Sequence, residues 1–353
     1  MIKQNKKILL GLLATALLST QAQAGFLNFN GEHEARITSL KIGSLDSTVS
    51  IQQSLKLNGS KRLPDGFKVN YEIGTGSDRR STWASTTKTT QIPVNINELN
   101  IEWKAAPGLQ VTLGRAALPF TSYSTVLFDP DLKLDILGGS YTTKITPQAD
   151  FSINVAYSVL DEYQTVGSST TKGEKFFGIQ PQVSYEISPT IKAEGYVAIY
   201  QTLDGDTAAE ANKLESTVFG IKGDFASPGV NNVSVYAEMN ENGKATTKGK
   251  SQAIGVVVGD KKVQGLGSWN ARIESRKVEA NSFGTPNDAS TKLSFEDDTA
   301  FITGSAYEGI KVAAETGLTK KTNAYLVYQS YESDPKVDAS KEESIRFGLR
   351  TNF

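Results

Sequence analysis

Side chains that could carry out acid–base or nucleophilic chemistry are scarce in this chain of 353 residues. His33 is the single histidine, and cysteine is absent. A Ser-His-Asp arrangement would have to use His33, and no serine lies in the G-x-S-x-G pattern of a nucleophile elbow. Glu32 and Glu34 stand at alternate positions, so they could share a site as glycosidase carboxylates do. Alternate acidic residues are equally typical of a solvated strand face, and we expect no catalytic site and no enzyme activity.

Metal binding has little support in the sequence. Asp129, Asp131 and Asp135 are close together, but they lack the acidic spacing and the glutamate of an EF-hand loop. One histidine and no cysteine exclude multi-histidine and thiolate sites. We therefore interpret these aspartates as solvated acids and expect neither a metal nor a cofactor.

Two pairs of arginines could act on charged solutes. Arg272 and Arg276 are four residues apart, as are Arg346 and Arg350. In an extended strand this spacing places both members of a pair on one face. The pairs could form a basic ladder that guides anions, or they could form structural ion pairs with neighbouring glutamates. The sequence leaves both interpretations open.

These residues belong to segments in which apolar side chains recur at every second position. Ile345, Phe347 and Leu349, for example, alternate with polar residues, and this period of two indicates β-strands. Turn signals containing proline and glycine recur about every forty residues. Pro181 lies within one of these segments and would remove a ladder hydrogen bond, which a bulge could accommodate. We predict sixteen strands, at 27–37, 48–58, 66–75, 94–104, 109–116, 132–145, 150–160, 175–187, 190–202, 213–224, 231–240, 251–259, 267–277, 306–316, 322–332 and 343–353.

The polar faces of these strands carry many charges of both signs. A dry, packed interior does not hold so many, because an unpaired buried charge costs several kcal/mol. Sixteen strands close into a barrel wide enough for water, whereas eight are filled by side chains. We therefore predict an all-β, transmembrane, antiparallel up-and-down β-barrel. Its expected channel-lining residues are Arg272, Arg276, Arg346, Arg350, Lys68, Glu72, Glu98 and Glu102.

The N-terminus has the three parts of a secretory signal. Lys3, Lys6 and Lys7 precede an apolar run from Ile8 to Leu18, and Ala22-Gln23-Ala24 matches a cleavage site. We expect residues 1–24 to be removed and residues 25–353 to form the barrel. An exported chain without cysteine is typical of a bacterial envelope protein rather than of a disulfide-linked secreted domain.

The signal, the regular turns and the final strand ending in Phe353 resemble those of Gram-negative outer-membrane porins. Alternating short turns and long polar loops are typical of the same class. The run from Leu113-Gly114-Arg115 through Pro119-Phe120 to Leu127-Phe128-Asp129-Pro130-Asp131 resembles one group of these porins. The resemblance implies a water-filled channel in the bacterial outer membrane for passive diffusion of small hydrophilic solutes and ions.

Further expectations follow from the resemblance alone. The third long loop of porins often folds into the barrel, and here it is 117–131, with Phe128, Asp129 and Asp131 as candidate constriction residues. The terminal Phe353 would be read by the barrel-assembly machinery. Partners would be outer-membrane lipids and small hydrophilic solutes, with a homotrimer as the assembly and no nucleic acid.

Two other classes remain open at this point. An outer-membrane barrel acting mainly as an adhesin would place its function in the long loops. A soluble, secreted β-propeller that binds ligands also repeats every ~40–45 residues, but it would use four short strands per repeat and carry blade signatures. No such signature is present in the sequence.

Overall fold

The computed structural model describes residues 29–75, 84–85, 94–124, 133–159, 164–166, 169–171, 175–203, 214–227, 230–245, 249–279, 282, 306–333 and 341–353. The predicted signal segment 1–24 lies outside them. Within this part of the chain, no helix combines the length and the apolar character needed to cross a membrane.

Sixteen long strands make up almost all of the described structure, and each corresponds to a strand predicted from the sequence. They are β1 (Phe29–Ile42), β2 (Thr48–Arg62), β3 (Phe67–Thr75), β5 (Val94–Ala106), β6 (Leu109–Ala116), β7 (Leu134–Thr146), β8 (Ala149–Val159), β11 (Lys175–Ser188), β12 (Ile191–Leu203), β13 (Glu215–Ser227), β14 (Val230–Asn242), β15 (Lys250–Gly259), β16 (Trp269–Val278), β17 (Tyr307–Gly317), β18 (Thr322–Ser333) and β19 (Lys341–Asn352).

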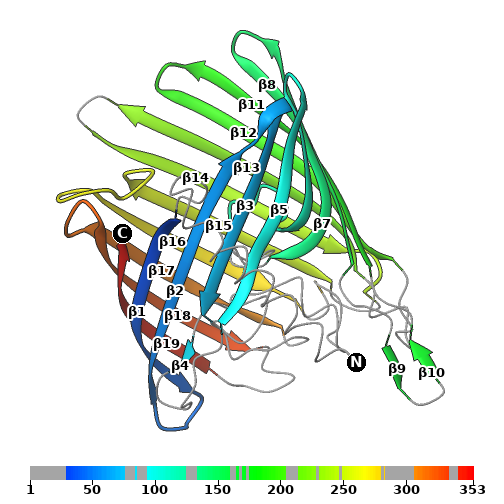
Figure 1. Ribbon diagram of the computed structural model, residues 1–353. Helices are drawn as coiled ribbons and strands as arrows, with labels where there is room; N and C mark the ends of the chain where they lie inside the picture. The colour runs from blue at the N-terminus through cyan, green and yellow to red at the C-terminus, as the bar shows by residue number, and fades with distance from the viewer. Residues whose placement is uncertain are drawn as a thin grey trace, which may run out of the picture.

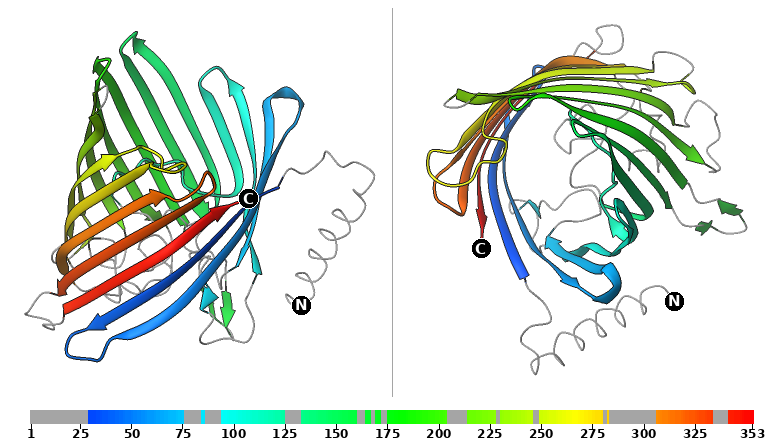
Figure 2. Two further views of the ribbon diagram at one scale, coloured as in Figure 1. Left: turned by 90° about the vertical axis from the view of Figure 1, so that its left-hand side faces the viewer. Right: turned by 90° about the horizontal axis from the view of Figure 1, so that it is seen from above.

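The strands form a closed barrel in which each long strand pairs antiparallel with the next one along the chain. The ring closes where β19, red in Figure 2, lies beside β1, blue. This seam is in register from Glu32↔Asn352 to Ile42↔Glu342. The terminal residue extends it, since the Phe353 N–H donates to the Gly31 carbonyl at 2.9 Å. The predicted fold class is confirmed.

The outer face of the barrel wall is apolar and the inner face is polar, which is the reverse of the arrangement in a soluble protein. On β19, Ile345 and Phe347 are 51% and 50% exposed, whereas Arg346 between them is 3% exposed. The same alternation places exposed apolar side chains on the outside of the other strands, and buried polar ones on the inside. An apolar outer surface around a polar interior is what a barrel in a hydrocarbon layer requires.

Short connections join the strands at one end of the barrel, the upper end in Figure 1. The two-residue turn between β5 and β6 uses Gly108 at φ +78°, and a side chain there would meet the Thr142 carbonyl. Near these turns the outer surface carries exposed aromatic rings, as at a membrane–water interface. They are Phe67, Trp103, Tyr185, Phe225 and Trp269.

Two local features differ from the sequence-based expectation. The segment 38–47, expected as a loop, continues β1 as far as Ile42, because residues 38–40 pair with both β2 and β19 and residues 41–42 pair with β19. Pro181 needs no bulge, since β11 pairs with β8 through Pro181↔Ile153 without a shift of register. The pairing of β11 with β12 is interrupted at 180–181, where proline has no N–H to donate.

Small strands also occur inside two of the expected long loops. β4 (Ala84–Ser85) adds to β2, and β9 (Gln164–Val166) pairs with β10 (Ser169–Thr171) as a separate ribbon.

The assignment of the two faces predicts that an arginine destabilises the barrel much more on the outer side of β8 than on the inner side. Val155→Arg places a charge on the outer surface in the middle of the strand and should destabilise the folded barrel by about 2–4 kcal/mol. Ser152→Arg, on the inner side, should cost less than about 1 kcal/mol. Denaturant titration of protein folded into lipid vesicles measures both. Equal costs at the two positions would contradict the assignment.

Candidate functional site

The inner wall of the barrel holds the charged residues predicted from the sequence. Arg272 and Arg276 point inward from β16, opposite in parity to the exposed Ile273. Arg346 and Arg350 do the same on β19. Each predicted pair thus shares one face of its strand, as the spacing requires.

Most of these guanidinium groups have polar partners on the wall. Arg350 Nε lies 3.2 Å from a Glu34 carboxylate oxygen, and Arg350 also pairs with Glu315 at 3.5 Å. Arg276 pairs with the fully buried Glu274. These contacts agree with the ion-pair interpretation for two of the arginines.

The other two arginines have different surroundings. Arg346 donates to the Gln329 amide oxygen at 2.8 Å. The guanidinium carbon of Arg272 lies 5.7 Å from the centre of the Tyr236 ring, which is a cation–π contact. Arg272 therefore differs from Arg276 in having an aromatic face beside its charge.

The predicted charged residues on β3 and β5 form a second group. Lys68 stands opposite Glu102 in register, with 3.3 Å between the ammonium nitrogen and the carboxylate. Glu72 stands opposite Glu98. Each of these two carboxylates accepts from an asparagine side chain, Glu72 from Asn97 at 3.4 Å and Glu98 from Asn100 at 2.7 Å.

A repeated arrangement, not recognised in the sequence, satisfies three other inward carboxylates. A tyrosine on one strand lies flat across a glycine on the next strand, and its hydroxyl donates to a glutamate on the strand beyond. We call this a Tyr–Gly–Glu unit. The three units are Tyr196–Gly220–Glu238, Tyr236–Gly255–Glu274 and Tyr325–Gly348–Glu34.

Glycine makes each unit possible, because a side chain there would collide with the tyrosine ring. In the first two units the three residues are in direct register, as in Tyr236↔Gly255↔Glu274. The sequence signal that could have revealed them is an inward glycine between an inward tyrosine and an inward glutamate on consecutive strands.

The residues that follow β6 return to the inner wall. Phe120 packs its ring against Phe176 and Tyr200, with centroids 6.2 and 5.0 Å away. Thr121 exchanges two hydrogen bonds with the Gln180 side chain: its N–H donates at 2.7 Å, and its carbonyl accepts at 2.8 Å. The described part of the predicted loop 117–131, residues 117–124, therefore contacts the inside of β11 and β12.

The same segment then reaches the glutamate of the first unit. The N–H groups of Tyr123 and Ser124 donate to Glu238 at 2.8 and 2.9 Å, and the hydroxyls of Ser122 and Ser124 also donate to it. The candidate constriction residues Phe128, Asp129 and Asp131 lie outside the described residues.

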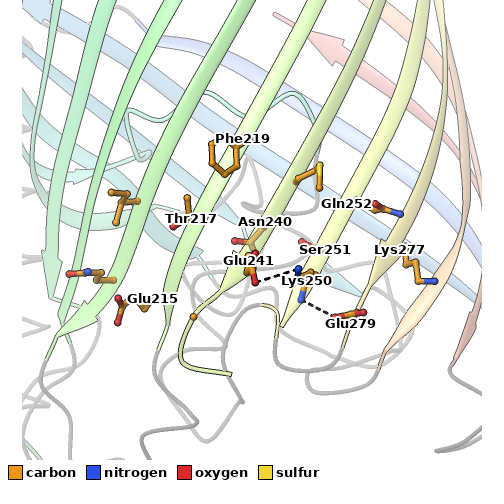
Figure 3. A pocket seen from close by; sticks show the side chains of 14 residues that line it. Glu215, Thr217, Phe219, Asn240, Glu241, Lys250, Ser251, Gln252, Lys277 and Glu279 are labelled. Atoms are coloured by element: carbon orange, nitrogen blue, oxygen red, sulfur yellow. Dashed lines mark hydrogen bonds and ion pairs between the residues drawn. The ribbon is translucent and has the colours of Figure 1, made fainter. Parts of the chain in front are cut away.

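A groove of about 720 Å³ lies on the other side of the wall, across β12 to β16 (Figure 3). Its side chains are mainly of the outward parity, with the exposed Phe219 at one end. Charged residues occupy the other end, where Lys250 pairs with Glu241 at 3.4 Å. The groove is therefore an outer-surface feature, separate from the inner wall.

Comparison with solved structures places this barrel among known folds. Over 97% of both chains it matches Pseudomonas putida OprB at high pH, with 13% identity and a TM-score of 0.63. An anion-selective porin from Comamonas acidovorans matches with 14% identity and a TM-score of 0.54, over 93% of this chain and 99% of that chain. The chain has the fold of the outer-membrane porins.

A further porin-fold structure, Salmonella typhi OmpF in complex with daunomycin, matches over 93% of this chain and 97% of that chain, with 11% identity and a TM-score of 0.55. No family model and no characterised protein matches the sequence. Identities this low establish the fold only. Within the described residues, no group of three or more histidine or acidic side chains is arranged to hold a metal ion.

The Tyr–Gly–Glu unit predicts a steric test. Gly255→Val should destabilise the barrel by about 1–3 kcal/mol, because the added methyl groups displace the Tyr236 ring and its hydrogen bond to Glu274. Gly195→Val, at a glycine with only ordinary contacts nearby, should cost clearly less. Equal costs in denaturant titrations would show that the tyrosine packing contributes nothing specific.

Proposed function

We propose that this protein is a porin of the bacterial outer membrane that lets small hydrophilic solutes and ions diffuse passively. One observation carries the proposal: a closed ring of sixteen strands presents apolar side chains outward and charged ones inward. A barrel of this size leaves an aqueous channel along its axis. Transport through it needs no cofactor and no energy source.

The predicted wall residues would line this channel. Their support is the inward parity of Arg272, Arg276, Arg346 and Arg350, and of the Lys68–Glu102 and Glu72–Glu98 pairs. Charges on a narrow aqueous wall raise or lower the local concentration of ions by their sign. We infer that solutes are filtered by width and by these wall charges.

The loop 117–131 would narrow the channel. Its described part supports this, since Phe120 to Ser124 lie against the inner side of β11, β12 and β14. We propose that Phe128, Asp129 and Asp131 continue this segment across the lumen as constriction residues.

The remaining partners follow from the same proposal. Residues 1–24 would be cleaved after export, and the exposed outer surface would contact outer-membrane lipids. The terminal Phe353, 57% exposed and hydrogen-bonded to β1, is placed at the seam where the assembly machinery would have to close the barrel. The assembly proposed from the fold is a homotrimer.

Conductance in a planar lipid bilayer tests the function. The purified, folded protein should insert and give stepwise current increases in plain salt solution, with no ligand added. A correctly folded barrel that stays electrically silent would contradict the porin proposal and favour an adhesin.

Charge reversal on the two faces of β16 tests whether ions pass along the inner wall. Arg272→Glu should shift the cation-to-anion permeability ratio toward cations by about threefold or more at low salt, because the charge stands on the inner wall. Lys277→Glu makes the same charge change on the outer face, where the lysine is 55% exposed and pairs with Glu308. It should leave the ratio unchanged. Reversal potentials in a salt gradient measure both, and equal shifts would place the ion path elsewhere.

A further inference from the structure

Glu238 on β14 is the point where the wall and the segment after β6 meet. The residue is 3% exposed, and its carboxylate accepts hydrogen bonds from three consecutive residues, Ser122, Tyr123 and Ser124. The Tyr196 hydroxyl donates to it from the wall. Two of the donors are backbone N–H groups, so the contact fixes the course of the chain and not only its side chains.

The other two Tyr–Gly–Glu units explain why the segment docks at this one. Glu274 is compensated by Arg276, and Glu34 by Arg350. Among the described residues, no lysine or arginine forms an ion pair with Glu238. A buried carboxylate without a cation must be satisfied by several strong donors. In this unit the segment 122–124 supplies them.

The contacts of the tyrosine rings also show that the segment stands where an arginine stands in the other units. In the other two units an arginine lies over the tyrosine ring, Arg272 over Tyr236 and Arg350 over Tyr325, each at 5.7 Å. In the first unit the ring beside Tyr196 is Tyr123, with 5.3 Å between the centroids. The segment therefore takes the place that an arginine takes elsewhere on the wall.

We propose that Glu238 is the positioning residue of the channel, which holds the segment 121–124 against the wall and so sets the width and steadiness of the pore. This proposal rests on the proposed porin function. The segment attaches specifically at Glu238 because no arginine of the described residues pairs with this carboxylate and because its two oxygens each accept from one of the two N–H groups. Gln180 holds the preceding residue, Thr121, and completes the attachment.

Amide hydrogen exchange tests the attachment without requiring transport. Glu238→Gln keeps the size of the side chain but removes the charge and one acceptor oxygen. Exchange at the N–H groups of Tyr123 and Ser124 should become at least about tenfold faster, because each loses a hydrogen bond to an ionised group. Unchanged exchange would overturn the proposal.

Glu34→Gln is the matched control. It removes the carboxylate of another Tyr–Gly–Glu unit, and Arg350 keeps Glu32 and Glu315 as partners. Exchange at Tyr123 and Ser124 should stay at the wild-type rate in this variant. Acceleration as large as that in Glu238→Gln would mean that the effect is general loosening of the barrel, and it would overturn a specific role for Glu238.

A reversible cross-link tests the effect on the pore. The chain has no cysteine, so Ser124→Cys with Glu238→Cys provides a unique pair. With free thiols this double variant should show a larger and noisier open-channel current than wild type. Bridging the thiols with a short bifunctional methanethiosulfonate should restore a quiet current, and reductant should reverse it.

The outcomes separate the two proposals. Current noise that is the same with free and bridged thiols, despite a bridge verified by mass spectrometry, would overturn the role of Glu238 in setting the pore. A silent wild-type barrel would overturn the porin function and with it that role, whereas slow wild-type exchange that accelerates in Glu238→Gln would still establish the attachment.

Discussion

The backbone ladder that closes between β1 and β19 is the constraint on which the rest of the structure depends. In hydrocarbon an unpaired backbone N–H or C=O costs several kcal/mol, so a sheet that crosses a membrane can have no free edge. The seam runs through eleven paired positions and ends with Phe353 bonded to Gly31. Once the ring is closed, successive side chains must point alternately to the outside and to the inside. Every feature of the wall follows from that division.

Placing charge on the inside creates a second requirement, because an inward carboxylate flanked by strands is only partly hydrated. The wall meets it with flat tyrosines over glycines, whose hydroxyls reach the next strand, and with arginines beside them. Where the arginine is missing, at Glu238, backbone N–H groups of the segment 122–124 take its role. The same hydrogen bonds therefore compensate the charge of Glu238 and fix the course of the inward segment.

Local patterns predicted the strands well, because a strand in this barrel is defined by its own alternation and by the turn that follows it. The segment 109–116 has the same bounds in the structure as Leu109–Ala116. The end of β1 was missed, since Thr38 to Ile42 look like a polar loop and become a strand by pairing with the neighbouring strands β2 and β19. The parity of Arg272 or Glu102 was likewise readable from spacing. The attachment of the segment 122–124 to Glu238 could not be predicted from spacing. It joins residues 114 to 116 positions apart and depends on the absence of an arginine beside Glu238.

The most direct measurement of the division between the two faces is the environment of nitroxide labels attached to single cysteines at positions 345, 346, 347, 349 and 350 of β19, in barrels folded into lipid vesicles. The account predicts a period of two: labels at 345, 347 and 349 collide mainly with oxygen dissolved in the lipid, and labels at 346 and 350 mainly with a water-soluble nickel chelate. Collision rates that do not alternate, or that alternate in the opposite phase, would contradict it.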